Sequence, residues 1–288
     1  MALHPAAPDD VDGILAAWAH SVQAIIDLGG SCRTEEFALE TACPGWSVKD
    51  QISHVTDIED QLAGGAAPPP VAGADRAHVR SAMGERTEAG VELRRDRPGQ
   101  AVVDELELVL AKRHAQLRDG LDSGSLTPET VVTMPIGPMP LVAGLRTRCF
   151  DVWTHEQDIR LALGQPGNLD SPAAAVTMAQ FERSLPRVVA KSAAIEPGHA
   201  VIIDLTGPLV GRMGVRVVET EDGKRRGEPL FTGEKHEGED DQRTVISLST
   251  AGLGRLIAGR AEPAQVNITV SGDESVARRV IEHLNIAP

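Results

Sequence analysis

The chain has few aromatic residues and no concentration of positive charge. Aromatic residues make up 2% of the 288 residues and tyrosine is absent, so the chain lacks the stacking platforms that single-strand binders use. The formal net charge is −14, and no lysine and arginine cluster is present to neutralise phosphates. These absences argue against nucleic acid as a partner.

Cysteines and long apolar runs are also scarce. Cys32, Cys43 and Cys149 are an odd number without C-x-x-C spacing, which disfavours both a disulfide framework and a cysteine-rich zinc site. We therefore expect a reducing, cytoplasmic location. No signal peptide is visible at the N-terminus, and no apolar stretch approaches the ~20 residues of a membrane span. We expect a soluble protein that does not bind membranes.

Two common catalytic signatures are missing. The sequence contains no G-x-x-x-x-G-K-[ST] loop and no credible strand, G-x-G-x-x-G, helix succession, so nucleotide chemistry is not supported. The G-x-S-x-G elbow of serine hydrolases is absent as well. The chemistry must be sought in other residue types.

Helical periodicity dominates the first two thirds of the chain. Ser47 and Asp50 form a capping box, and Gly164 ends a later helical pattern. A polar, weakly periodic segment at 75–97 is expected to add some helix, and the proline-rich residues 127–140 are expected to be extended. The helices are predicted at 11–29, 48–62, 102–117, 141–163 and 172–189.

Beyond Lys191 the pattern changes to short β-branched runs. Helices follow at 250–258 and 273–284, and residues 219–242 are interpreted as a hairpin with a solvated loop. Strands followed by late helices indicate an α+β fold class. We expect a helical domain at 1–190 and a smaller α+β domain with a mixed sheet at 198–288. The strands are predicted at 200–205, 213–218, 244–248 and 266–270.

One helix carries a pair of residues that can bind a metal. Asp151 and His155 stand four apart, so at about 100° per residue they project from one face of the predicted helix. Asp158 falls on nearly the same side and could orient the imidazole of His155. Such pairs also occur on solvated helix faces, so the spacing alone does not establish a site.

A third candidate lies on the second predicted helix. His54 sits off the apolar stripe of that helix, where it could face a cleft or could equally be a packed or surface histidine. Two imidazoles and one carboxylate are the donors that catalytic zinc takes, with a fourth position left open. Trp46 and Trp153 are interpreted as wall or core residues, and Cys149 as a small buried apolar residue.

Two segments and the domain order resemble a known family. CPGWSVKDQISHVTDIE around His54 and RTRCFDVWTHEQDIRLALGQPG around Asp151 look like the signature regions of the DinB-like superfamily, in its mycothiol-dependent maleylpyruvate isomerase branch. The stretch TVISLSTAGLGRLIAGR and the AQVNITVSGDESVARRVIEHLN that follows resemble the sterol-carrier-protein-2-like C-terminal domain of that branch. The resemblance covers nearly the whole chain.

The resemblance implies a site and a fold. It implies an up-down four-helix bundle that holds a divalent metal, usually zinc, at His54, Asp151 and His155. The isomerase pattern has glutamate where this chain has Asp151, whose side chain is about one methylene shorter. A C-terminal arginine of the isomerase matches Arg260 here, with Arg255 as a second choice for binding substrate.

The same resemblance implies a thiol enzyme. A metal-bound low-molecular-weight thiol, mycothiol rather than glutathione, would attack a small electrophile that carries a carboxylate, by cis-trans isomerisation or by S-transfer. Arg260 would bind the carboxylate. Two alternatives stay open: a binding module without turnover, and a metal-dependent hydrolase. We expect a monomer or a homodimer.

Overall fold

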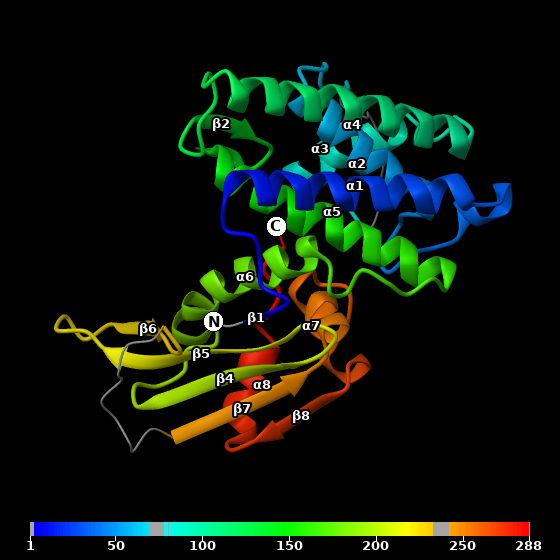
Figure 1. Cartoon of the computed structure of the whole chain (residues 1–288). Helices are drawn as coiled ribbons and strands as arrows, with labels where there is room; N and C mark the ends of the chain where they lie inside the picture. The colour runs from blue at the N-terminus through cyan, green and yellow to red at the C-terminus, as the bar shows by residue number, and fades with distance from the viewer. Residues whose placement is uncertain (1–2, 70–77, 80, 233–241, 288) are drawn as a thin grey trace. The chain divides into compact units, whose positions relative to one another are not determined.

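The computed structural model of the chain describes residues 3–69, 78–79, 81–232 and 242–287 (Figure 1). Its contacts divide the chain into two compact units. We call Asp9–Gly167 the helical unit, and Met1–Pro8 together with Asn168–Pro288 the sheet unit. In the described residues, no helix is both long and apolar enough to cross a membrane. Helices and a mixed sheet confirm the predicted α+β class.

The helical unit is built on four long helices. The first, α1, packs against α4 and α5, and α2 packs against the same two helices, while the shorter α3 lies beside α2. Trp18, Ile52, Leu106 and Leu145 are among the fully buried side chains between them. The bounds are α1 Val11–Ser31, α2 Val48–Leu62, α3 Ala82–Glu92, α4 Gly99–Asp122 and α5 Leu141–Leu163, with a 3-10 turn η1 at Thr34–Ala38.

Local sequence signals set most of the helix ends. The Asp10 side chain accepts a hydrogen bond from Gly13 N at 2.6 Å, which caps α1. The helix α1 was predicted to end at the pair Gly29-Gly30, and it ends at the next residue, Ser31. Gly29 is buried, and a Cβ there would lie 2.6 Å from Val103 Cγ2. This glycine therefore allows close approach of α1 and α4 and does not end the helix.

Residues 127–140 are extended as predicted, but they also pair with each other. The strands β2 (Val131–Met134) and β3 (Gly137–Pro140) form a two-stranded antiparallel hairpin. Gly137 has φ 121°, a value that favours glycine, at the start of β3. Of the segment 75–97, residues 75–77 and 80 lie outside the described residues, and the helix found there is α3.

The sheet unit contains a mixed sheet in the order β1-β5-β4-β7-β8, with β6 paired to β5. The pair β4 and β7 is parallel, and the other pairs are antiparallel. All four predicted strands and the β5–β6 hairpin are present, and residues 233–241 of the expected loop lie outside the described residues. The bounds are β1 Leu3–His4, β4 His199–Thr206, β5 Val210–Glu219, β6 Arg225–Pro229, β7 Gln242–Leu248 and β8 Ile268–Ser271.

Helices of the sheet unit pack on these strands. The helix α6 contacts β5 and β6, α7 contacts β4, and α8 contacts β7 and β8. A Cβ at Gly227 in β6 would lie 2.6 Å from Pro186 O, so this glycine allows the strand to approach α6 closely. The bounds are α6 Pro172–Arg187, α7 Thr250–Ile257 and α8 Glu274–Ile281, with a π-helical turn η2 at Val188–Ser192 and a 3-10 turn η3 at Pro263–Gln265.

The division between the units differs from the expected boundary. We expected a helical domain at 1–190 and a second domain at 198–288, whereas the contacts divide the chain after Gly167 and assign residues 1–8 to the sheet unit. The reason is that α6 packs on strands and that β1 pairs with β5. Helical periodicity shows that α6 has an apolar face, but not which element covers it. The likeness of the C-terminal part to sterol-carrier-protein-2 domains stays a prediction.

Candidate metal centre

The helix α5 presents Asp151 and His155 to one side. It begins after Pro140 and ends at Gly164, which has φ 64° in the left-handed region that glycine tolerates. Over this length the two side chains stand one turn apart, with His155 Nε2 3.6 Å from Asp151 Oδ1. Both face inward in the helical unit, and His155 is buried.

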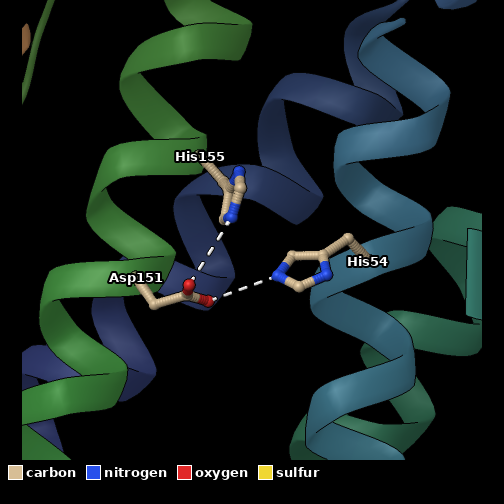
Figure 2. Close-up of side chains that lie close together, drawn as sticks. All are labelled: His54, Asp151 and His155. Atoms are coloured by element: carbon tan, nitrogen blue, oxygen red, sulfur yellow. Dashed lines mark ion pairs between the residues drawn. The ribbon is translucent and has the colours of Figure 1, made fainter. Parts of the chain in front are cut away.

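His54 meets this pair from α2. The Ser47 Oγ and the Asp50 carboxylate bond each other's backbone N–H, which starts α2 as the capping box predicted. Two turns on, His54 Nε2 lies 3.5 Å from Asp151 Oδ2, and one donor atom from each of the three residues lies within 4.8 Å of the others. Figure 2 shows the three side chains pointing toward one another from two helices. Tertiary packing therefore brings together the residues that the sequence singled out.

The protonation of His155 is set by Gln51, a residue that sequence analysis did not assign to the site. Gln51 Nε2 donates to Thr41 Oγ1 at 2.7 Å and to Asp158 Oδ2 at 3.3 Å, so its amide oxygen faces His155 Nδ1, which it contacts. An amide oxygen only accepts, and Nδ1 must then carry the proton. The other ring nitrogen, His155 Nε2, faces Asp151.

Asp158 lies close to His155 and also contacts Gln51. Its Oδ2 lies 3.8 Å from His155 Nδ1, beyond hydrogen-bond distance, whereas it accepts the bond from Gln51. Asp158 is buried. Its observed effect is to fix the amide of Gln51, which in turn holds the imidazole. The sequence signal for Gln51 was its position one turn before His54, on the same flank of the helix.

Trp46 forms a wall beside both imidazoles, as its position next to the motif suggested. Its ring centroid lies 4.9 Å from that of His54 and 6.0 Å from that of His155. Its Nε1 donates to Glu88 Oε2 at 2.8 Å, which fixes the indole. An aromatic wall of this kind excludes water from the imidazoles and limits their rotation.

Asp151 is held by a chain of buried charges that sequence analysis missed. Arg148 Nη1 donates to Asp151 Oδ2 at 2.7 Å, and Arg148 Nε donates to Glu59 Oε1 at 2.9 Å. The same Glu59 oxygen accepts from Trp18 Nε1, and Arg113 Nη1 lies 2.9 Å from Glu59 Oε2. We call Glu59, Arg113 and Arg148 the buried charge cluster.

A pattern in the sequence could have revealed this cluster. Glu59 continues the apolar stripe of α2, and Arg113 and Arg148 continue those of α4 and α5. All three are at most 5% exposed. Charged residues at core positions of neighbouring helices require each other, because an unpaired buried charge is costly. This argument would have predicted the contact between them.

The electrostatics of the centre suit a cation. Burial is the main reason that the pKa of His54 is lowered to about 4, so its imidazole is neutral near pH 7. Burial opposes ionisation of Asp151, but Arg148 and the two histidines outweigh it and hold the pKa of this carboxyl well below its usual range. Near neutral pH the centre thus offers the carboxylate of Asp151 and the neutral imidazole of His54, the protonation states that metal ligands need.

The residues present fit a divalent metal. Four-coordinate zinc with bonds of roughly 2.0–2.1 Å places neighbouring donor atoms about 3.3 Å apart. His155 Nε2 lies 3.6 Å from Asp151 Oδ1, close to that separation, and one donor atom from each of the three residues lies within 4.8 Å of the others. Three protein donors also leave one position for another group, as catalytic zinc sites do.

The two arginines named from the resemblance belong to the sheet unit. Arg255 lies in α7, and its buried Nε has no hydrogen-bond partner among the described residues. Arg260 follows α7 and donates from Nη1 to Ala258 O at 3.0 Å. Their roles in substrate binding stay predictions.

The core assignments in the motifs hold. Trp153 and Cys149 are buried. Burial raises the pKa of the Cys149 thiol to about 12, so this residue is neither a thiolate nor a nucleophile near neutral pH.

The comparisons with known proteins agree with this geometry. The helical unit carries two imidazoles and one carboxylate on adjacent helices. It is therefore a helical domain of the class that can bind a metal through three protein ligands. Residues 18–160 match the family model described as the mycothiol maleylpyruvate isomerase N-terminal domain. The part of the chain that matches belongs to this family, and the family resemblance of the sequence is confirmed. Among curated proteins, no match was found.

Two solved structures share the fold over nearly the full length. They are the mycothiol-dependent maleylpyruvate isomerase and a histidine-to-alanine mutant of it, each 17% identical to this chain with a TM-score of 0.55. In both comparisons 91% of this chain and 93% of the other is covered. At this identity the likeness extends to the fold, including the succession of a helical part and a sheet part.

Proposed function

We propose that this protein is a mycothiol-dependent enzyme that isomerises, or transfers the thiol to, a small electrophilic carboxylate. One observation carries the proposal: His54, Asp151 and His155 converge within 4.8 Å in a unit that matches the N-terminal domain of mycothiol maleylpyruvate isomerases. The proposed ligands of a divalent metal, with zinc the first candidate, are these three residues. When bound, such an ion lowers the pKa of a coordinated thiol and makes it nucleophilic near neutral pH.

The residues around the ligands hold the site in one arrangement. Gln51 keeps the proton of His155 on Nδ1, so that Nε2 is available as a donor. Arg148 occupies Asp151 Oδ2 at 2.7 Å, which favours Oδ1 as the atom that binds. Trp46 shields both imidazoles from water. Such preorganisation keeps a nucleophile and its target in a reactive geometry.

The reaction follows from the chemistry of thiols with conjugated double bonds. The thiol sulfur bonds to one alkene carbon, the former double bond rotates as a single bond, and loss of the sulfur restores the alkene in its other geometry. If the sulfur stays and the adjacent carbon takes a proton, the product is a thioether. We propose Arg260 as the cation that binds the substrate carboxylate, because its guanidinium can do so through two parallel hydrogen bonds.

Metal analysis tests the ligands. His54→Ala, Asp151→Asn and His155→Ala should each lose most of the metal that the wild-type protein carries after purification, measured by mass spectrometry of the elements. His20→Ala, which removes an exposed histidine of α1, is the matched control and should keep the wild-type metal content. Equal metal content in all four variants would contradict the proposed site.

Incubation with mycothiol and maleylpyruvate tests the reaction. A product of unchanged mass with a new alkene geometry, followed by NMR, indicates the isomerase, and a thioether adduct indicates the S-transferase. Either activity should require mycothiol and should fall in His54→Ala but not in His20→Ala. If metal is bound and a panel of electrophilic carboxylates remains unchanged, the protein is a binding module and the proposal is wrong. Turnover of an ester or amide without thiol would indicate a hydrolase instead.

A further inference from the structure

The helical unit contains a cavity apart from the three proposed metal ligands. A cavity of about 300 Å³ lies among α2, α4, α5 and β2. Its volume is at the lower end of the range of small-molecule pockets. Most of its wall is apolar, with Leu62, Leu117, Met134 and Leu145 among the lining side chains.

One charged side chain lines this cavity. Arg113 is only 5% exposed, yet its Nε and Nη1 have no hydrogen-bond acceptor among the described residues. Nη1 lies 2.9 Å from Glu59 Oε2, but the N–H does not point at that oxygen, which also lacks a hydrogen bond. Buried polar atoms are hydrogen-bonded in the great majority of proteins, and each exception suggests a missing ligand or water.

Arg113 shares its counter-ion with a second cation. Glu59 is a single negative charge that contacts both Arg113 and Arg148. Arg148 also forms an ion pair with Asp151, whereas Arg113 has Glu59 as its carboxylate partner. Burial is the main reason that the pKa of Arg113 is lowered. The negative charge of Glu59 raises this pKa, and the like charge of Arg148 lowers it further. The face of Trp18, 5.2 Å from the guanidinium carbon, adds only a weak attraction. A second carboxylate beside Arg113 would stabilise its charge.

The wall of the cavity limits the class of this anion. A phosphate or a dicarboxylate would need more donors than Arg113, Gln116 and Thr133 supply. At roughly 30 Å³ for each water-sized group, the space holds on the order of ten non-hydrogen atoms. We propose that the cavity binds a medium-chain aliphatic monocarboxylate, with its carboxylate on Arg113 and its chain against Leu117, Met134 and Leu145. Octanoate has about the right size.

Calorimetric titration of the metal-free protein with octanoate tests this site. We expect saturable one-to-one binding, and binding of 1-octanol, which has the same chain without the charge, at least tenfold weaker. Leu108→Gln, on an exposed side chain of α4, is the control and should bind octanoate as the wild type does.

Two variants remove the site in different ways. Arg113→Gln removes the charge and should weaken octanoate binding at least tenfold. Gly144→Leu fills the cavity from α5 without changing Arg113, since a Cβ at Gly144 would lie 3.0 Å from the flexible Met134 Sδ, and it should abolish binding. Circular dichroism checks that both fold.

Three results would overturn the proposal. They are the absence of saturable binding to the wild type, equal binding of octanol and octanoate, and unchanged octanoate binding by a folded Gly144→Leu protein. Without saturable binding, the cavity is not a carboxylate site and Arg113 is hydrated. Equal binding of octanol and octanoate would mean that the cavity binds the chain but not the carboxylate. Unchanged binding by Gly144→Leu would mean that octanoate binds elsewhere.

Discussion

Replacing Glu59 with glutamine should destabilise the helical unit strongly. The change keeps the size of the side chain but removes the negative charge that faces Arg113 at 2.9 Å and accepts from Arg148 at 2.9 Å. Glu59 is fully buried, so Arg113 would remain in the core without its counter-ion, and Arg148 would keep only Asp151. Removing one partner of a buried ion pair costs about 3–5 kcal/mol, a large fraction of the total stability of a domain.

Urea unfolding of the metal-free protein, followed by tryptophan fluorescence, measures this loss. The three tryptophans of the chain, Trp18, Trp46 and Trp153, all lie in the helical unit, so their fluorescence reports the unfolding of that unit. Glu107→Gln makes the same chemical change on an exposed residue of α4 and should alter the free energy of unfolding by less than about 0.5 kcal/mol. A loss below about 1 kcal/mol for Glu59→Gln would refute the reasoning.

Two further measurements identify the cause of the loss. Adding Arg113→Met to Glu59→Gln removes the guanidinium that lost its counter-ion, so the double variant should recover part of the stability. The pKa of Glu59 is also lowered, because Arg148 and Arg113 outweigh the effect of burial. Its contribution is therefore present above the ordinary value of 4.5 and is lost as pH falls through the lower, folded-state pKa. The difference between wild type and variant should shrink over that acid range.

Three other outcomes are expected. Gln51→Leu should weaken zinc affinity about 10-fold to 100-fold, because His155 loses the hydrogen-bond acceptor that fixes its tautomer. A competition assay with a fluorescent chelator measures the affinity, and an unchanged value would contradict this role of Gln51. In metal-free protein the imidazole of His54 should titrate near pH 4 in NMR spectra, since burial lowers its pKa, with His54→Gln used to assign the resonance. A midpoint near the ordinary value of 6.5 would contradict this prediction. Cys149 should resist a thiol reagent at pH 8 in the folded protein and react after denaturation, whereas the half-buried Cys32 and Cys43 are accessible to it.

Local sequence signals were sufficient for most of the secondary structure. The Ser47 capping box, the Asp10 cap and the left-handed Gly164 act within a few residues of themselves, so they fix helix ends without tertiary contacts. Gly29 is the exception, because its role depends on Val103 of another helix. A glycine at a helix end and a glycine at a helix contact look the same in the sequence.

The partners within the site could not be read in the same way. Sequence analysis gave Asp158 as a residue that could orient His155, and in the structure Gln51 contacts the imidazole while Asp158 accepts a hydrogen bond from the Gln51 amide. Both residues lie on the correct faces of their helices. Spacing gives the direction of a side chain but not its reach toward a neighbour on another helix, and the choice between two such partners depends on distances of about 1 Å.

The sequence by itself determined that Asp151 and His155 share a face, since the period of a helix is a local property of the backbone. It also placed charged residues, Glu59 and Arg113 among them, in stripes that must be buried. Only the tertiary structure decided that His54 meets the pair, that α6 packs on strands, and which charges neutralise each other in the core. Those outcomes depend on which apolar faces pack together. The pairing of faces is determined by the total apolar surface that the folded chain buries, and this cannot be read from any single segment.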